Sequence, residues 1–453
     1  MDTDPGFWFL SGMSKTFRSW DVDQVWLLPP SVHELVPEGH LAHLVRDTVR
    51  ETLDLSAILD TYAEERGYPP YHPVMMTALL LYAYSQGIYS SRRIARACEE
   101  RVDFMAVTAQ QKPDFRTIND FRGRHLKALA DLFLQVLTLC REAGLVKLGH
   151  VALDGTKIRA NASKHKAMSY DRMKQTEPRL AAEVERWIKR AEETDAAEDR
   201  EFGADRRGDE LPDWVANKQA RLAKIREAKA ALEAEAKRSA SERKEPEGPR
   251  PGRPAKTAPG TPPDKAQRNF TDPESRIMKT PDGYQQCYNA QAAVDAASQV
   301  IVACDLTNAA NDVHQLTPMV MQIRENNGRH ARELSADAGY CSEDNLKELN
   351  RRHIKAYIAT GRQKHGAASP TSGSDPKDRP RVKRMRARLR RAGHRSRYRL
   401  RKQTVEPVFG QIKGGRGFRQ FLLRGLDQVS LEWMLVCTAH NLVKWGAVAG
   451  ARA

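Results

Sequence analysis

The sequence predicts a mixed α/β protein with an all-α region before the core and a helical hairpin inserted into it. Three observations support this fold class. Apolar residues recur at helical spacing from His40 to Gly144. Strand-like and helical segments then alternate from Gly149 onward. Between residues 165 and 283 the strand-like pattern stops, and two long amphipathic segments replace it.

The composition indicates a polyanionic partner. The 453 residues suffice for roughly two or three domains. The formal net charge of +16 favours nucleic acid over a membrane as partner. Six scattered cysteines, with no C-x-x-C pair, argue against a zinc site and a disulfide framework. Apolar runs fall short of the ~18–20 residues that span a bilayer. The acidic N-terminus does not resemble a signal peptide, and we expect Met13 to be the native start.

We divide the chain before the core into an N-terminal extension, residues 1–38, and a helical domain, residues 39–145. Residues 78–100, ALLLYAYSQGIYSSRRIARACEE, resemble a helix-turn-helix with Gly87 in the turn. The second helix carries Arg92, Arg93 and Arg96, which could enter a major groove. The alternative is an ordinary helical hairpin with a solvated basic face. Further along, Thr117 is expected to cap one long helix that ends at Gly144.

The core is assigned to residues 146–164 and 284–450. Strands are predicted at 151–154, 287–296, 299–307, 332–337 and 354–360, and helices at 312–326 and 342–352. Residues 431–445 form an apolar helix that is expected to cover the sheet. Asp312 is interpreted as a helix N-cap, and His314 as a surface residue.

The insertion is predicted to be a helical hairpin, residues 165–238, followed by a Pro/Gly-rich basic linker, residues 239–283. One apolar residue every three or four positions defines a face on each helix. These faces comprise Leu180, Val184, Trp187 and Ala191 on the first helix and Val215, Leu222, Ile225 and Leu232 on the second.

Three acids stand out by their context. Asp154 and Asp337 each end a strand, and Glu406 lies beside apolar Val405 and Val408. Each alone could make a turn or a salt bridge. Together they could meet in a cleft, because sites on α/β sheets gather at strand ends. Carboxylates without Cys or His suit Mg²⁺ or Mn²⁺, and a pair of such ions supports phosphodiester cleavage.

A basic run follows the predicted core strands. From Lys377 to Lys402, 14 of 26 residues are Lys or Arg, and Asp378 is the one acid. An ordinary solvated face mixes both signs of charge, whereas this run does not. We therefore expect it to meet DNA phosphates, with an affinity that falls steeply as salt rises.

The order of these motifs resembles the DDE transposases of bacterial insertion sequences, which have an RNase H-like catalytic domain. The resemblance rests on VALDGTKIRANAS, YNAQAAVD, TNAAND, SADAGY and TVEPVFGQIK, and on the helical region before them. It implies that Asp154, Asp337 and Glu406 bind the catalytic metal ions. Many relatives carry Tyr-x2-Arg-x3-Glu-x6-Lys, which implies DNA contacts for Tyr398 and Lys413. Arg401 lies one residue too far from Glu406, and Lys402 has the expected spacing, so either could be the basic residue.

The resemblance implies an enzyme that uses two Mg²⁺ or Mn²⁺ ions to hydrolyse DNA at the ends of its own mobile element and to join those ends to target DNA. Its partners would be duplex DNA, namely terminal inverted repeats and target, and a second copy of the chain on DNA. It would act in the bacterial cytoplasm, at the nucleoid. Two alternatives remain: an RNase H-like nuclease that does not join strands, and an inactive DNA-binding protein descended from a transposase.

Overall fold

The computed structural model describes residues 31–62, 70–202, 213–241, 258–361, 368–373 and 379–450, except for the side chains of 191–202 and 213–215. Met13, Lys377 and Asp378 lie outside these ranges, as do residues 242–257 of the expected linker. Within the described ranges, no helix combines the length and apolar character needed to cross a bilayer.

The N-terminal helices pack around one buried helix, α3. Every residue from Met76 to Ser85 of α3 is buried, as expected for a helix that is apolar on all sides. Helices α1, α5, α6 and α14 all contact it. The elements before the sheet are α1 (Leu41–Glu51), α2 (Ser56–Leu59), α3 (Pro73–Ser85), α4 (Ser91–Glu100), α5 (Val102–Thr108), α6 (Phe115–Arg124) and α7 (Leu126–Glu142).

The single long helix predicted from Thr117 to Gly144 is wrong. Asp114 caps α6, accepting hydrogen bonds from the backbone N–H of Arg116 at 2.7 Å and of Thr117 at 3.2 Å. The Thr117 hydroxyl donates to the same carboxylate instead of capping a helix itself. The helical backbone is interrupted at His125, where φ is −106° and ψ is 14°, so α6 and α7 are separate.

A mixed sheet forms the core, which confirms the α/β prediction. Its order is β4-β5-β1-β7-β8, and β6 also pairs with β5. Strands β1, β7 and β8 are parallel to one another, whereas β5 is antiparallel to β1, β4 and β6. The strands are β1 (His150–Arg159), β4 (Arg276–Thr280), β5 (Gly283–Asp295), β6 (Ile301–Thr307), β7 (Glu333–Ala336) and β8 (Lys355–Ile358).

Two strand boundaries differ from the predictions. β1 does not end at Asp154, because β5 pairs with it as far as Arg159. Asp154 is therefore a mid-strand residue opposite Ala292. The expected linker was also too long at its C-terminal end, since β4 lies within 239–283 and pairs with the first half of β5. β4 was not predicted as a strand, because its sequence RIMKT mixes polar and apolar residues without a clear pattern.

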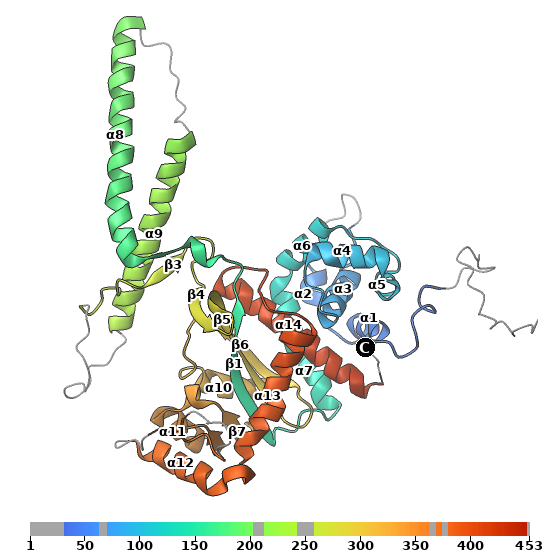
Figure 1. The fold of residues 1–453 in the computed structure, drawn as a ribbon. Helices are drawn as coiled ribbons and strands as arrows, with labels where there is room; N and C mark the ends of the chain where they lie inside the picture. Colours follow the sequence, from blue (N-terminus) through green and yellow to red (C-terminus); the bar gives the residue numbers. More distant parts are fainter. Residues whose placement is uncertain are drawn as a thin grey trace, which may run out of the picture.

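Helix α14 joins the sheet to the N-terminal helices. It lies between them in Figure 1, contacting β6 on one side and α7 and α3 on the other. The N-terminal helices and the sheet consequently share one hydrophobic core. The helices that follow β6 are α10 (Leu316–Asn327), α11 (Glu343–Arg351), α12 (Pro380–Ala392), α13 (Leu400–Gly410) and α14 (Leu426–Val448).

The inserted hairpin consists of α8 (Tyr170–Phe202) and α9 (Asp213–Ser241), and it projects away from the sheet (Figure 1). Its base is a two-stranded ladder of β2 (Ala167–Ser169) and β3 (Gln267–Asn269). A separate apolar cluster holds the two helices together. On the predicted faces Leu180, Val184, Leu222, Ile225 and Leu232 are buried and Trp187 is half-buried, whereas the side chains of Ala191 and Val215 are outside the described ones.

Candidate active site

Asp154 and Asp337 lie side by side on neighbouring strands. β1 and β7 run parallel with Leu153 opposite Ala336, so the aspartates that follow these residues are at the same level. Asp154 is buried, with 8% of its surface exposed. β7 ends before Asp337, whose Oδ1 accepts a hydrogen bond from the backbone N–H of Gly339 at 2.8 Å. The pairing of the two strands thus brings together two acids that are 183 residues apart in the chain.

Glu406, on α13, is connected to Asp154 through the side chain of Arg401. The Arg401 guanidinium donates from Nη2 to Asp154 Oδ2 at 2.7 Å and from Nη1 to Glu406 Oε1 at 2.8 Å. Arg401 is 12% exposed, whereas Lys402 points to solvent. Arg401 is therefore the basic residue that contacts the acids, although Lys402 has the spacing that the family pattern requires.

Burial makes Asp154 and Asp337 costly to ionise. Burial raises the pKa of Asp154 to about 6, although Arg401 acts in the opposite direction. Burial also raises the pKa of Asp337. For Arg401, burial alone would lower the pKa, but Asp154 and its neighbours raise it above the usual value. Such a site favours a cation among the acids.

A fourth acid, Asp312, also lies here, and its predicted role as a helix N-cap is wrong. Helix α10 begins at Leu316, after Gln315. Asp312 Oδ1 instead accepts hydrogen bonds from Asn289 Nδ2 at 2.5 Å and from Gln291 Nε2 at 2.8 Å. Both amides are fully buried on β5. The sequence did carry a signal for this contact, since two amides at alternate positions interrupt an apolar strand.

Gly155 makes room for this network. A Cβ atom at Gly155 would lie 2.4 Å from Gln291 Nε2 and 2.8 Å from Asp312 Oδ1. At Gly339, a Cβ atom would lie 3.3 Å from Asp312 Oδ2 and 3.0 Å from Asp337 Oδ1. Asp312 is thus packed between β1 and the turn after β7. The glycine after Asp154 serves this close approach, not a turn of the chain.

Two lysines lie close to the part of β1 that follows Asp154. Lys157 Nζ lies 3.9 Å from Asp312 Oδ1 and donates to the backbone oxygen of Ala310 at 3.2 Å. Lys413 Nζ donates to Thr156 Oγ1 at 3.0 Å and to the backbone oxygen of Lys157 at 3.1 Å. Burial lowers the pKa of both lysines. Lys413 was predicted from the family pattern, whereas Lys157 was not predicted.

Tyr398 lies beside the acids. It was expected to contact DNA, but its side chain is largely buried. It is 8% exposed and belongs to the hydrophobic core. Burial raises its pKa, and the charges of Arg401 and Asp337 also act on it. In this structure Tyr398 helps to form the wall of the site.

Two protein-family models match the chain. A transposase domain (DUF772) matches residues 30–124, and a transposase DDE domain matches residues 255–442. The two matches together cover more than half of the sequence. The chain belongs to the DDE transposase family. Searches of curated proteins and of solved structures gave no match.

Membership of this family confirms the RNase H-like fold of the transposase. The match to the DDE domain begins after the hairpin, so it contains Asp337 and Glu406 but not Asp154. Asp154 is brought to the other two acids by the pairing of β1 with β7 and by its contact with Arg401.

Half of the basic run of the transposase forms α12, which packs against β8. Arg386 of α12 is buried and donates to the backbone oxygen of Thr360 at 3.1 Å, and Arg388 donates to that of Ala356 at 3.3 Å. Lys383, Arg384 and Arg391 are exposed. Part of the positive charge therefore holds α12 on the sheet, and part of it faces solvent.

The predicted helix-turn-helix of the transposase comprises α3 and α4. Gly87 in its turn has a φ of +74°, and a Cβ atom there would lie 2.5 Å from the backbone oxygen of Arg416, so the turn is docked on the catalytic domain. Arg92, Arg93 and Arg96 are exposed on α4. Arg96 also pairs with Glu100 at 2.7 Å.

The donors at this site match a divalent cation in their chemistry. Carboxylate oxygens are the ligands that Mg²⁺ and Mn²⁺ prefer. In the described ranges, however, no three Asp, Glu, His or Cys side chains are grouped closely enough to hold an ion as they stand. Arg401 supplies the positive charge between Asp154 and Glu406. A cation bound by these two acids would compete with Arg401 for their oxygens.

Proposed function

We propose that this transposase hydrolyses the phosphodiester at each end of its own mobile element, and that the resulting 3′-OH then attacks a target phosphodiester and displaces a 3′ oxygen of the target strand. The observation that supports it best is that Asp154 of β1 lies level with Asp337, directly after β7, and that Arg401 is bonded to both Asp154 and Glu406 of α13. Three separate segments contribute one acid each, which a structural salt bridge does not require.

In this proposal Asp154, Asp337 and Glu406 hold Mg²⁺ or Mn²⁺. Two such ions, if bound there, would activate a water and stabilise the leaving 3′ oxygen. Asp312, held by Asn289 and Gln291, keeps Lys157 near the acids. Lys157, Lys413 and a released Arg401 supply positive charge for the DNA phosphates on this face.

The proposed substrate is duplex DNA, comprising the terminal inverted repeats and the target. The exposed cations of α12 would bind its backbone, and Arg92, Arg93 and Arg96 of α4 would face a groove. Because two element ends must be held together for joining, we propose that two copies of the chain assemble on DNA.

Labelled duplexes that carry the inverted repeats bracketing the coding region, mixed with a target plasmid and Mg²⁺, provide the test. The wild type should cleave and yield joined product. Asp154→Ala, Asp337→Ala and Glu406→Ala should each lose cleavage but bind DNA as before. Asp312→Asn should cleave more slowly than the wild type, because without the charge of this side chain Lys157 is no longer kept near the acids. Asp344→Asn, on the exposed surface of α11, is the matched control.

Each contrary result has a defined meaning. Full cleavage by any one of the alanine variants removes that residue from the catalytic set. Cleavage by the wild type without joined product supports a nuclease that does not transfer strands. DNA binding by the wild type without cleavage supports an inactive DNA-binding descendant.

A further inference from the structure

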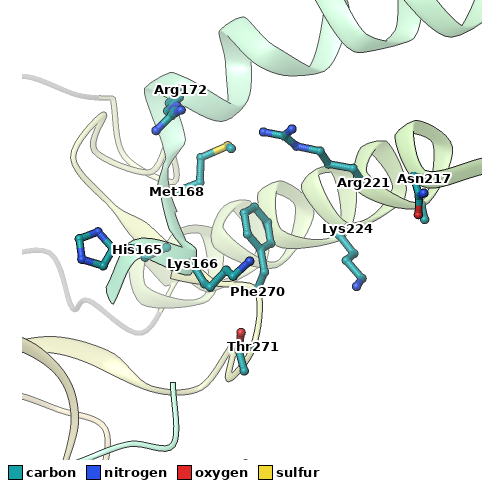
Figure 2. A pocket seen from close by; sticks show the side chains of 11 residues that line it. His165, Lys166, Met168, Arg172, Asn217, Arg221, Lys224, Phe270 and Thr271 are labelled. Atoms are coloured by element: carbon teal, nitrogen blue, oxygen red, sulfur yellow. The ribbon is translucent and has the colours of Figure 1, made fainter. Parts of the chain in front are cut away.

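The base of the inserted hairpin contains a basic pocket of about 570 Å³. Its walls come from the segment after β1, from the first turn of α8 and from α9 (Figure 2). Met168 and Phe270 provide apolar surface. The polar side chains include His165, Lys166, Arg172, Arg221 and Lys224, and none of the lining residues is acidic.

The cations of this pocket differ from the others on the hairpin. Elsewhere on the hairpin, several acids of α8 and α9 are paired with cations: Glu177 with Arg226 and Lys229, Glu183 with Lys218, and Glu235 with Arg276. No ion pair within the described ranges includes Lys166, Arg172, Arg221 or Lys224, and all four are exposed. Positive charge thus collects here without acids to balance it, as at a surface for polyanions.

The pocket walls are held in place. β2 and β3 form a ladder, and Phe270 donates its backbone N–H to the backbone oxygen of Lys166 at 3.0 Å. Asn269 Nδ2 donates to the backbone oxygen of Ser163 at 2.8 Å. Beneath the cations, Met168, Met173 and Ile225 belong to the apolar cluster of the hairpin. A surface fixed in this way can present its cations at set positions.

β1 connects the pocket to the proposed active site. The five steps along β1 from Asp154 to Arg159 span about 17 Å, which is close to the rise of five base pairs. The segment that lines the pocket begins soon after, at His165. One duplex could therefore contact both the acids and the base of the hairpin.

We propose that this pocket binds the phosphate backbone of duplex DNA and extends the DNA-binding surface of the transposase from the acids onto the hairpin. The proposal rests on the proposed function for the presence of DNA at the acids. Arg221 extends from α9 toward Arg172 at the start of α8 (Figure 2), and Lys166 and Lys224 also line the pocket. Contacts with the DNA backbone carry no sequence information, so they should form with a duplex of any sequence.

The test measures binding of the full-length protein to a fluorescent mixed-sequence duplex of about 30 base pairs, roughly three helical turns. The buffer contains EDTA, so that cleavage does not occur and binding is measured apart from catalysis. Arg221→Glu/Lys224→Glu should weaken the Kd at least tenfold at ~0.1 M salt. Arg221→Gln/Lys224→Gln should lower the slope of log K against log salt by about 2, because each lost phosphate contact removes about 0.9.

Lys237→Glu/Arg238→Glu makes the same change of charge further along α9, at two exposed residues away from the pocket. This control should change the Kd less than threefold. Equal losses of DNA affinity in both charge-reversal variants would show that only net charge matters, and would overturn the proposal. Unchanged DNA affinity in both pocket variants would also overturn it. So would a loss of self-association, seen by sedimentation, without a change in DNA affinity, since the pocket would then bind a second copy.

The outcome is separable from that of the cleavage experiment. If the wild type fails to cleave but the pocket variants still bind DNA more weakly, the pocket proposal stands and the catalytic one fails. If the alanine variants of the three acids lose cleavage but the pocket variants bind DNA normally, the catalytic proposal stands and the pocket proposal fails.

Discussion

At the scale of single residues, Arg401 determines how the proposed catalytic acids are arranged. Asp154 is buried, and its closest positive partner is the Arg401 guanidinium at 2.7 Å. The same guanidinium holds Glu406, whose side chain is 46% exposed. Breaking a buried pair by removing one partner is costly, because the other charge remains buried and alone.

We expect Arg401→Ala to lower the free energy of unfolding by about 3–5 kcal/mol in EDTA. Mn²⁺ should then restore more stability to the variant than it adds to the wild type, because no guanidinium competes for the carboxylates. Denaturant titrations with and without Mn²⁺ measure both effects. Lys402→Ala is the adjacent control and should remain within about 0.5 kcal/mol of the wild type. Equal Mn²⁺ responses of Arg401→Ala and the wild type would show that Arg401 does not compete with the cation.

At the scale of elements, α14 carries a fully buried acid into the core. Glu432 accepts hydrogen bonds from the backbone N–H groups of Leu422 and Leu423, each at 3.1 Å. Burial raises its pKa from 4.5 to about 7. A closing apolar helix was predicted for this segment, but the role of Glu432 was not, because it depends on a loop that folds back from α13.

The raised pKa of Glu432 fixes the sign of a pH effect. The folded state keeps this proton up to about pH 7, and the unfolded state loses it near 4.5, so stability falls as pH rises between these values. As pH rises through this interval, the free energy of unfolding of Glu432→Gln should therefore increase by about 3 kcal/mol relative to that of the wild type. His440, whose pKa burial lowers to about 3, acts in the opposite direction but is present in both proteins.

Urea titrations of Glu432→Gln and the wild type at several pH values measure this difference. Glu325→Gln, on the exposed surface of α10, is the control and should show little change with pH. A stability difference between Glu432→Gln and the wild type that stays constant from pH 4.5 to 7 would contradict the titration of Glu432 in this range.

At the scale of the whole molecule, the net charge of +16 is divided between structural and solvent-facing cations. Arg386, Arg388 and Arg401 are engaged within the fold. Lys383, Arg384 and Arg391 face solvent from α12. DNA affinity should thus depend on which cations are removed and not only on how many.

We expect Lys383→Ala/Arg384→Ala to reduce the slope of log K against log salt by about 2 if both residues meet phosphates. Arg324→Ala/Lys347→Ala removes the same charge from exposed positions on α10 and α11 and should leave the slope almost unchanged. Fluorescence anisotropy on a duplex from about 50 to 200 mM salt measures both slopes. Equal slopes for the two double variants would rule out α12 as a specific contact surface.

The sequence by itself determined features that depend on local pattern: the fold class, the order β1, β5, β6, α10, β7, α11 and β8, and the apolar faces of the hairpin helices. It also singled out Asp154, Asp337 and Glu406, whose catalytic role stays a prediction. Periodicity and motif order are local properties that a single chain displays. Tertiary structure decided the rest. β5 extends β1 past Asp154, β4 joins the sheet, and Asp312 turns from an expected cap into a partner of Asn289 and Gln291. These outcomes depend on strand pairing and on hydrogen bonds between residues far apart in the chain, which periodicity does not encode.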